Sequence, residues 1–155
     1  MDPGIIDDDP VVTIDTIPPA AIEDFIARLP GAGSIALQWK APGDDGTSGT
    51  AAAYDIRYSR ATIDEDNWDD ADSFAYPPAP TRGGTIQTCR VYGLDANTHY
   101  FLAIKARDEA GNEADLSRNA EGTTGPEYNS PGPVTDLAAS AVDSVTFLLT
   151  WTAPG

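Results

Sequence analysis

The feature that most constrains this chain is a repeat at one fixed offset. Eight residues around Trp39 recur, with the same spacing, 112 residues later around Trp151. The first set comprises Pro19, Asp24, Ala27, Leu37, Trp39, Ala41, Pro42 and Gly43, and the second Pro131, Asp136, Ala139, Leu149, Trp151, Ala153, Pro154 and Gly155. Solenoid repeats are only about 20 to 50 residues long, whereas this offset equals a domain plus a linker. The sequence therefore predicts modules in tandem, one whole and a second barely begun.

Composition and repeat together divide the chain into four segments. Residues 1–17 are acidic and proline-bearing, which is typical of a linker or tail. Residues 18–124 form the complete module, 125–130 a linker, and 131–155 the truncated start of a second module. We expect 131–155 to be loosely ordered, because an isolated pair of strands is marginal in water.

Alternating apolar and polar residues predict strands with one buried face. Ile35, Leu37 and Trp39 alternate with polar or small residues, and so do Tyr54, Ile56 and Tyr58. Further strands are expected over 85–92, 99–108 and 118–124, an irregular one over 22–29 that turns at Pro30-Gly31, and a short edge strand near Phe74. This pattern predicts an all-β, immunoglobulin-like antiparallel β-sandwich of about seven strands.

Several residues at the right mutual spacing carry a family resemblance. They are a Pro-Pro lead-in, Trp39, the run Tyr54-Asp55-Ile56-Arg57-Tyr58, Leu94, Thr98-His99-Tyr100 and Ala106-Arg107-Asp108. Residues 18–124 resemble a fibronectin type III domain, most of all the bacterial variety of extracellular modular proteins, and 131–155 resemble the start of a second copy. The resemblance makes Trp39 the core tryptophan, Leu94 a buried leucine, and Tyr100 a tyrosine whose hydroxyl bonds back to the main chain. With the alternating Tyr54, Ile56, Leu102 and Ile104, these residues form the predicted core.

The charge of the chain limits its partners. The chain has nine Lys and Arg residues and 25 Asp and Glu residues, which gives a formal net charge of −16. Such a field repels nucleic-acid phosphates and anionic lipid surfaces, so we expect neither nucleic-acid binding nor membrane insertion. No signal peptide or membrane-spanning stretch is evident, and an export signal is expected on sequence outside this fragment. The single Cys89 excludes an internal disulfide.

Two patterns suggest ligand sites, one of which fails on its spacing and the other on its structural context. The acidic run 64–72 suggests calcium, but the third ligand position of a calcium loop falls on Trp68 and no glycine follows. Gly31 to Ala36 fit a dinucleotide-binding pattern, yet they precede a strand where a helix is needed. We therefore predict no metal ligand, no cofactor and no cofactor-binding residue, with the acidic run left open as a calcium site.

Catalytic residues are not indicated. His99 is the sole histidine, and no oriented partner or nucleophile accompanies it. Cys89 falls on the inward face of its strand with Val91, where a thiol acts as a small hydrophobe. We expect no catalytic residues and no enzyme activity.

Four aromatic residues, Trp68, Phe74, Tyr76 and Tyr92, have no evident place in the core. Exposed aromatic rings can bind sugars, and Trp68 and Tyr76 are the candidate ligand contacts. In the alternative, Trp68 covers the edge of the sheet beneath the long connection 60–84.

The resemblance implies a non-catalytic, monomeric spacer and interaction module of a larger extracellular or cell-surface protein. Its partners are then the neighbouring domains of the same polypeptide. The alternative is a binding module for a polysaccharide or another protein, which would use the loops 41–50, 60–84 and 108–112.

Overall fold

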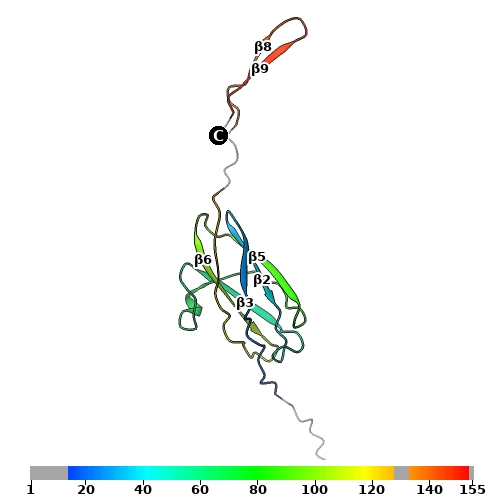
Figure 1. Ribbon diagram of the computed structural model, residues 1–155, viewed down its shortest axis with the longest axis vertical. Helices are drawn as coiled ribbons and strands as arrows, with labels where there is room; N and C mark the ends of the chain where they lie inside the picture. The colour runs from blue at the N-terminus through cyan, green and yellow to red at the C-terminus, as the bar shows by residue number, and fades with distance from the viewer. Residues whose placement is uncertain (1–13, 128–132, 154–155) are drawn as a thin grey trace, which may run out of the picture.

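The computed structural model describes residues 14–127 and 133–153 (Figure 1). Within these ranges the regular structure is strand, apart from one three-residue 3-10 helix, η1 (Trp68–Asp70). All strand pairs within the sheets are antiparallel. The predicted all-β antiparallel sandwich is confirmed.

Seven strands of the first module form two sheets. The three-stranded sheet has the order β1 (Ile26–Gly31), β2 (Ser34–Lys40) and β5 (Ile86–Tyr92). The four-stranded sheet has the order β4 (Asp72–Ser73), β3 (Ala53–Ser59), β6 (His99–Arg107) and β7 (Ala120–Thr123). Strands β4 and β5 are thus both edge strands, one in each sheet.

The core lies between the two sheets, where the period-2 pattern places its apolar side chains. On β2, Ile35, Leu37 and Trp39 are all at most 1% exposed. The Trp39 ring meets the Tyr54 ring of the opposite sheet edge-on, with centroids 5.3 Å apart. Each fully buried side chain of this size contributes about 2 kcal/mol through the hydrophobic effect, so these strands hold the sheets together.

All seven residues predicted for the core are buried. They are Trp39, Tyr54, Ile56, Leu94, Tyr100, Leu102 and Ile104. The Tyr100 hydroxyl accepts a hydrogen bond from the main-chain N–H of Asp95 across 3.1 Å. This bond fixes the corner that leads into β6, at the place the resemblance implies.

The first strand differs from its prediction. It begins at Ile26, although Ile22 ahead of it is also buried. Instead of turning at Pro30, the chain bulges, with Leu29 at a positive φ of 42° and its side chain 75% exposed. Because Pro30 has no N–H to donate, it suits an irregular position of this kind. The hairpin then turns at residues 32–33.

A second, smaller apolar cluster lies on the outer face of the four-stranded sheet. The connection from β3 to β4 folds back through η1 and buries Ile63 and Trp68 against Ala103 of β6. Ala71 and Leu116 pack against the same cluster. Strand β6 is therefore covered on both faces at Ala103, which is fully buried.

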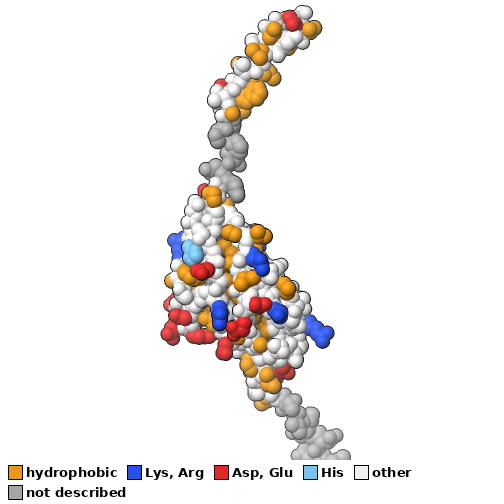
Figure 2. Space-filling view, in the orientation of Figure 1, with side chains coloured by type: hydrophobic (Ala, Val, Ile, Leu, Met, Phe, Trp, Pro, Cys, Tyr) orange, Lys and Arg blue, Asp and Glu red, His pale blue; other side chains and the backbone are white. Residues whose placement is uncertain are grey.

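A hairpin of β8 (Ala138–Ala141) and β9 (Phe147–Thr150) forms a separate two-stranded sheet. The apolar residues of this hairpin and of the position after it are exposed, including Phe147 at 68% and Trp151 at 57%. Figure 2 shows hydrophobic side chains on the surface of this segment. Pro131, Pro154 and Gly155 of the repeat lie outside the described residues. The loose order expected of 131–155 in solution stays a prediction.

The register of the hairpin equals that of β1 and β2. Ala27 is paired with Leu37, and 112 residues later Ala139 is paired with Leu149. The repeat thus extends from sequence to strand register.

Candidate functional site

Three of the unplaced aromatic residues gather along one groove between the edge strands β4 and β5. Phe74, Tyr76 and Tyr92 line this groove, which has a volume of about 650 Å³. Tyr76 is 83% exposed and Tyr92 67%. Phe74 is half-buried and packs against the main core. The groove offers open aromatic surface, the property expected of a binding site for an apolar or planar group.

Trp68, the other predicted ligand contact, lies elsewhere and is only 7% exposed. Two cations stand over its ring: the Arg57 guanidinium carbon is 4.7 Å from the ring centroid and the Lys105 ammonium 5.2 Å. Arg57 also donates a hydrogen bond to the Trp68 carbonyl oxygen at 2.8 Å. Packing and cation–π contacts account for this side chain, and its ring offers no open platform to a sugar.

Two residues of the acidic run 64–72, Glu65 and Asp69, form ion pairs, and the acids of the run are not grouped closely enough to hold a metal ion. Glu65 accepts a hydrogen bond from the Lys105 ammonium at 2.6 Å, which lowers the pKa of the Glu65 carboxyl. Asp69 pairs with Arg57 at 3.2 Å. Among the described residues, the one group of three acidic side chains spaced to hold a metal ion lies elsewhere. The calcium interpretation of this run gains no geometric support.

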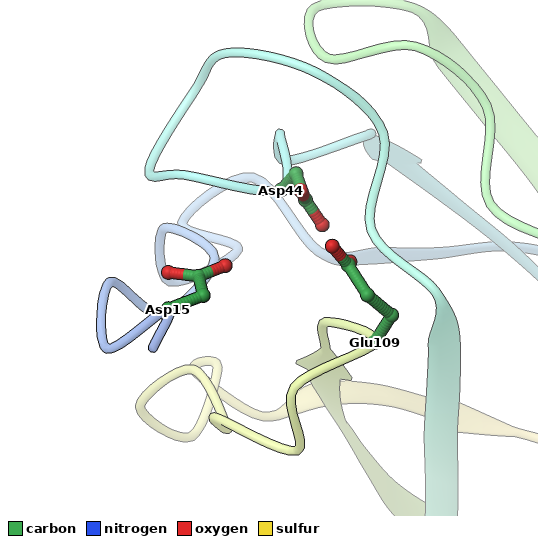
Figure 3. Close-up of side chains that lie close together, drawn as sticks. All are labelled: Asp15, Asp44 and Glu109. Carbon is green, nitrogen blue, oxygen red and sulfur yellow. The ribbon is translucent and has the colours of Figure 1, made fainter. Parts of the chain in front are cut away.

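That group consists of Asp15, Asp44 and Glu109, whose nearest carboxylate oxygens all lie within 4.8 Å of one another. Figure 3 shows the carboxylates of Asp44 and Glu109 pointing toward each other, with Asp15 facing them. The three come from the segment before β1, the loop after β2 and the loop after β6. The loops 41–50 and 108–112 therefore meet at one end of the sandwich, as binding loops on a rigid scaffold do.

Two carboxylates in such contact cannot both be charged without a cost. The Oδ1 atom of Asp44 is shielded from solvent and has no hydrogen-bond donor within the part of the chain that the structure describes. The hydrogen bond that a protonated Asp44 makes to Glu109, together with burial, raises the pKa of Asp44 to about 6. Asp44 therefore holds its proton more tightly than an ordinary aspartate does. Carboxylate oxygens are also the ligands that hard cations prefer, but an acidic cluster alone defines no metal site and we assign none.

The neighbouring turn is held by a buried carboxylate. Asp108 is 2% exposed and accepts hydrogen bonds from the main-chain N–H of Asn112 at 2.8 Å and from its side-chain amide at 2.7 Å. Burial acts to raise the pKa of Asp108, but these hydrogen bonds outweigh it and lower that pKa. The Asn112 amide also donates to the Asp15 carbonyl oxygen at 3.3 Å. This network ties the segment before β1 to the loop after β6.

A buried amide anchors the chain beside the groove. The Gln87 side chain accepts a hydrogen bond from the Tyr54 hydroxyl at 2.6 Å and from the Thr81 N–H at 3.1 Å. It also donates to the Ala79 carbonyl oxygen at 2.9 Å. The proline-rich end of the connection 60–84 is thereby held against β5, where it forms one wall of the groove.

Cys89 and His99 occupy structural positions. Cys89 is half-buried and packs against the main core, and burial raises the pKa of its thiol to about 11. A protonated thiol is a poor nucleophile. The His99 ring lies on the exposed surface of β6, 3.0 Å from the Thr123 hydroxyl and 3.3 Å from a Glu121 carboxylate oxygen.

Sequence reasoning found the aromatic residues but not their grouping, and it missed the acidic triad. Asp15 and Glu109 are 94 positions apart in a sequence that contains 25 acidic residues, so nothing distinguishes them before folding. A search for acidic residues in the loops that one end of the sandwich brings together would have found Asp44 and Glu109.

Among the described residues, no helix has both the length and the apolar character needed to cross a membrane.

A comparison with protein families identifies the fold. The model of the fibronectin type III domain matches residues 20–123. The chain belongs to this family. The chain is also similar to part of calcium-activated chloride channel regulator 1 from Equus caballus, with 32% identity over 113 residues, and from Homo sapiens, with 30% over 112 residues. These matches cover 69% and 68% of the chain, but only 12% of the length of either relative.

Among solved structures, the FN1–FN3 domains of chicken CNTN1 are similar to this fibronectin type III domain. The TM-score is 0.50 and the identity 20%, over 70% of this chain and 33% of that one. At this identity the likeness concerns the fold alone.

Proposed function

We propose that this chain is a non-catalytic spacer and interaction module of a larger extracellular or cell-surface multidomain protein. Family membership and the small share of its relatives that it spans support a module within a longer polypeptide. Its partners are then the neighbouring domains of that polypeptide, and the module itself is monomeric. The likeness to the bacterial variety stays a prediction, and the curated relatives reported above are mammalian.

The observation that carries this proposal is the repeated register of the two hairpins. Ala27 and Leu37 are paired across β1 and β2 as Ala139 and Leu149 are across β8 and β9. A repeat that reproduces register at the spacing of a domain plus linker is what tandem modules require. We therefore interpret 18–124 as one module, 125–130 as the linker, and 131–155 as the first two strands of a second copy.

The experiment completes the second copy from the chain itself. Because Ala41-Pro42-Gly43 matches Ala153-Pro154-Gly155, residues 44–124 can be appended directly after Gly155. We expect a second cooperative unfolding transition and a blue shift of tryptophan fluorescence as Trp151 becomes buried. The matched control appends the same residues in scrambled order. If the native extension remained as protease-sensitive as the scrambled one, the second-copy interpretation would be lost.

A second candidate function is binding at the aromatic groove, to a polysaccharide or to another protein. The exposure of Tyr76 and Tyr92 beside Phe74 favours it. A polysaccharide panel tests the sugar alternative through tryptophan fluorescence and through the affinity of Tyr76→Ala. Saturable binding that Tyr76→Ala abolishes would favour the sugar, and no response would leave the spacer role in place.

A further inference from the structure

The aromatic groove continues into an acidic cavity. The cavity has a volume of about 420 Å³ and shares Tyr58 and Gly93 with the groove as lining residues. Asp70 and Asp72 line its far side, both exposed. One continuous surface between β4 and β5 is therefore apolar at one end and acidic at the other.

The one cation among the residues that line the cavity, Arg60, is paired with a third acid. Arg60 and Asp95 both line the cavity and form an ion pair with each other. Neither Asp70 nor Asp72 makes an ion pair within residues 14–127 and 133–153. Burial and the nearby charge of Asp72 raise the pKa of the Tyr58 hydroxyl. The residues that line the cavity thus carry a net negative charge, which comes from the two acids that form no ion pair within the described chain.

The one cation among the residues that line the apolar end does not pair with Asp70 or Asp72. Arg90 borders the groove, but its guanidinium donates hydrogen bonds to the Leu29 carbonyl oxygen at 3.1 Å and to the Ser34 hydroxyl at 3.0 Å. These contacts direct it toward β1 and β2. The groove floor is formed by Phe74 and the half-buried Cys89, whose burial keeps its thiol neutral.

The strands that border this surface each have an edge with no strand partner. β4 pairs only with β3, and β5 only with β2, among the described strands, and the connection beside β5 is bonded to it through the Gln87 side chain. Free edges accept extended main chain, and pockets beside them then select its side chains. A neutral sugar would use the aromatic end alone, and an anionic polysaccharide would be repelled by the acids and by the net charge of −16.

We propose that this surface binds an extended cationic peptide segment, in which an aromatic or aliphatic side chain fills the groove and an adjacent Lys or Arg meets Asp70 and Asp72. The inference rests on the interaction role proposed above and names its partner class. Charge complementarity sets the orientation of the bound peptide, because its basic residue lies on the acidic side of Tyr58, next to Asp70 and Asp72.

The test measures fluorescence anisotropy of a labelled peptide, Gly-Ser-Phe-Lys-Gly-Phe-Lys-Ser-Gly, titrated with the full chain. Two control peptides replace both Phe residues by Ser, or both Lys residues by Glu. We expect saturable binding of the first peptide only. Asp70→Asn with Asp72→Asn should weaken it about tenfold, roughly what two partly exposed ion pairs amount to, and Tyr76→Ala should weaken it by at least as much.

The matched control protein carries Asp66→Asn and Asp115→Asn. These changes remove the same charge from exposed positions that line neither the groove nor the acidic cavity. It should bind like the parent chain. Equal loss in this control, or equal binding of the peptide without Phe, would show general charge attraction and overturn the proposal. Failure of a chain with unchanged thermal stability to bind the peptide would also overturn it. Sugar binding lost in Tyr76→Ala would instead assign the groove to a sugar.

The two proposals fail in different experiments. Absence of peptide binding would not change the outcome of appending residues 44–124, because that extension tests the strands β8 and β9 and not the groove.

Discussion

The carboxylate of Asp24 accepts a hydrogen bond from the main-chain N–H of Lys40 across 2.9 Å. Asp136 makes the same contact with the N–H of Thr152, at 2.9 to 3.0 Å. In each hairpin the aspartate lies two residues before the first strand and ties it to the residue after the tryptophan. The repeat thus includes Asp24 and Asp136, which close the hairpins, as well as apolar residues.

Asp24→Ala removes this closure from the complete module. We expect the free energy of unfolding to fall by about 1 kcal/mol, the usual net value of one hydrogen bond. Urea denaturation followed by tryptophan fluorescence measures it. Glu23→Ala is the adjacent control, because Glu23 is exposed and its one ion pair among the described residues is with Arg118, at 3.8 Å. Its removal should change stability by less than about 0.5 kcal/mol. Equal effects of the two variants would contradict a structural role for Asp24.

Trp68→Ala tests whether this residue packs or binds. Because Trp68 is buried against Ile63 and Ala103, its loss should destabilise the module by about 3 kcal/mol. Tyr76→Ala should change stability by less than about 0.5 kcal/mol, since that side chain is 83% exposed. Thermal melts of the two variants separate the roles. A stable Trp68→Ala protein would contradict the packing assignment.

Gln87→Ala removes the anchor of the groove wall. The Tyr54 hydroxyl, the Ala79 carbonyl oxygen and the Thr81 N–H each lose a partner, and we expect a loss of about 2 kcal/mol of stability. Amide hydrogen exchange should quicken at Thr81. Thr88→Ala, at the exposed neighbouring position, is the control and should leave that exchange unchanged.

The pKa of Asp44 predicts how stability depends on pH. Its folded pKa of about 6 lies above the ordinary value of 3.8, so the folded state binds the proton more tightly than the unfolded state. The contribution of Asp44 to the free energy of unfolding therefore rises as pH falls from about 6 to about 4. Asp44→Asn should flatten this part of the stability profile, measured by urea denaturation across the range. Parallel profiles for variant and parent would contradict the raised pKa.

Cys89 should be slow to react with thiol reagents while the chain is folded. Its pKa of about 11, against an ordinary value of 9.0, lowers the thiolate fraction near neutral pH by about 100-fold. The rate of modification by a disulfide reagent should rise by at least that factor in concentrated urea. Equal rates in the folded and unfolded chain would show that the thiol is open to solvent.

The alternation of Ile35, Leu37 and Trp39 was enough to predict β2, because a strand with one buried face repeats every second residue. The first strand was predicted less accurately. Pro30 indicates a turn by local preference, but pairing with β2 continues past it through a bulge, and the turn moves to residues 32–33. The contacts of the whole hairpin thus outweigh the local preference of Pro30 for a turn.

The candidate sites were less accessible from sequence. Trp68 stands among acidic residues, and its burial depends on Lys105 and Ala103, which come from a strand more than thirty residues later. The groove depends on two edge strands lying side by side in different sheets. Such contacts have no period along the chain, so only the assembled fold brings them together.

The equal registers of β1–β2 and β8–β9 also bear on how such a chain avoids folding errors. A hairpin with the register of β1–β2 presents the same main-chain pattern to β5, and misassembly by exchange of equivalent strands is a common failure of tandem modules. Phe147 occupies the repeat position of Ile35, which is fully buried in the first module. The larger Phe147 ring would overfill the space that Ile35 occupies, so this position disfavours the exchange of one hairpin for the other.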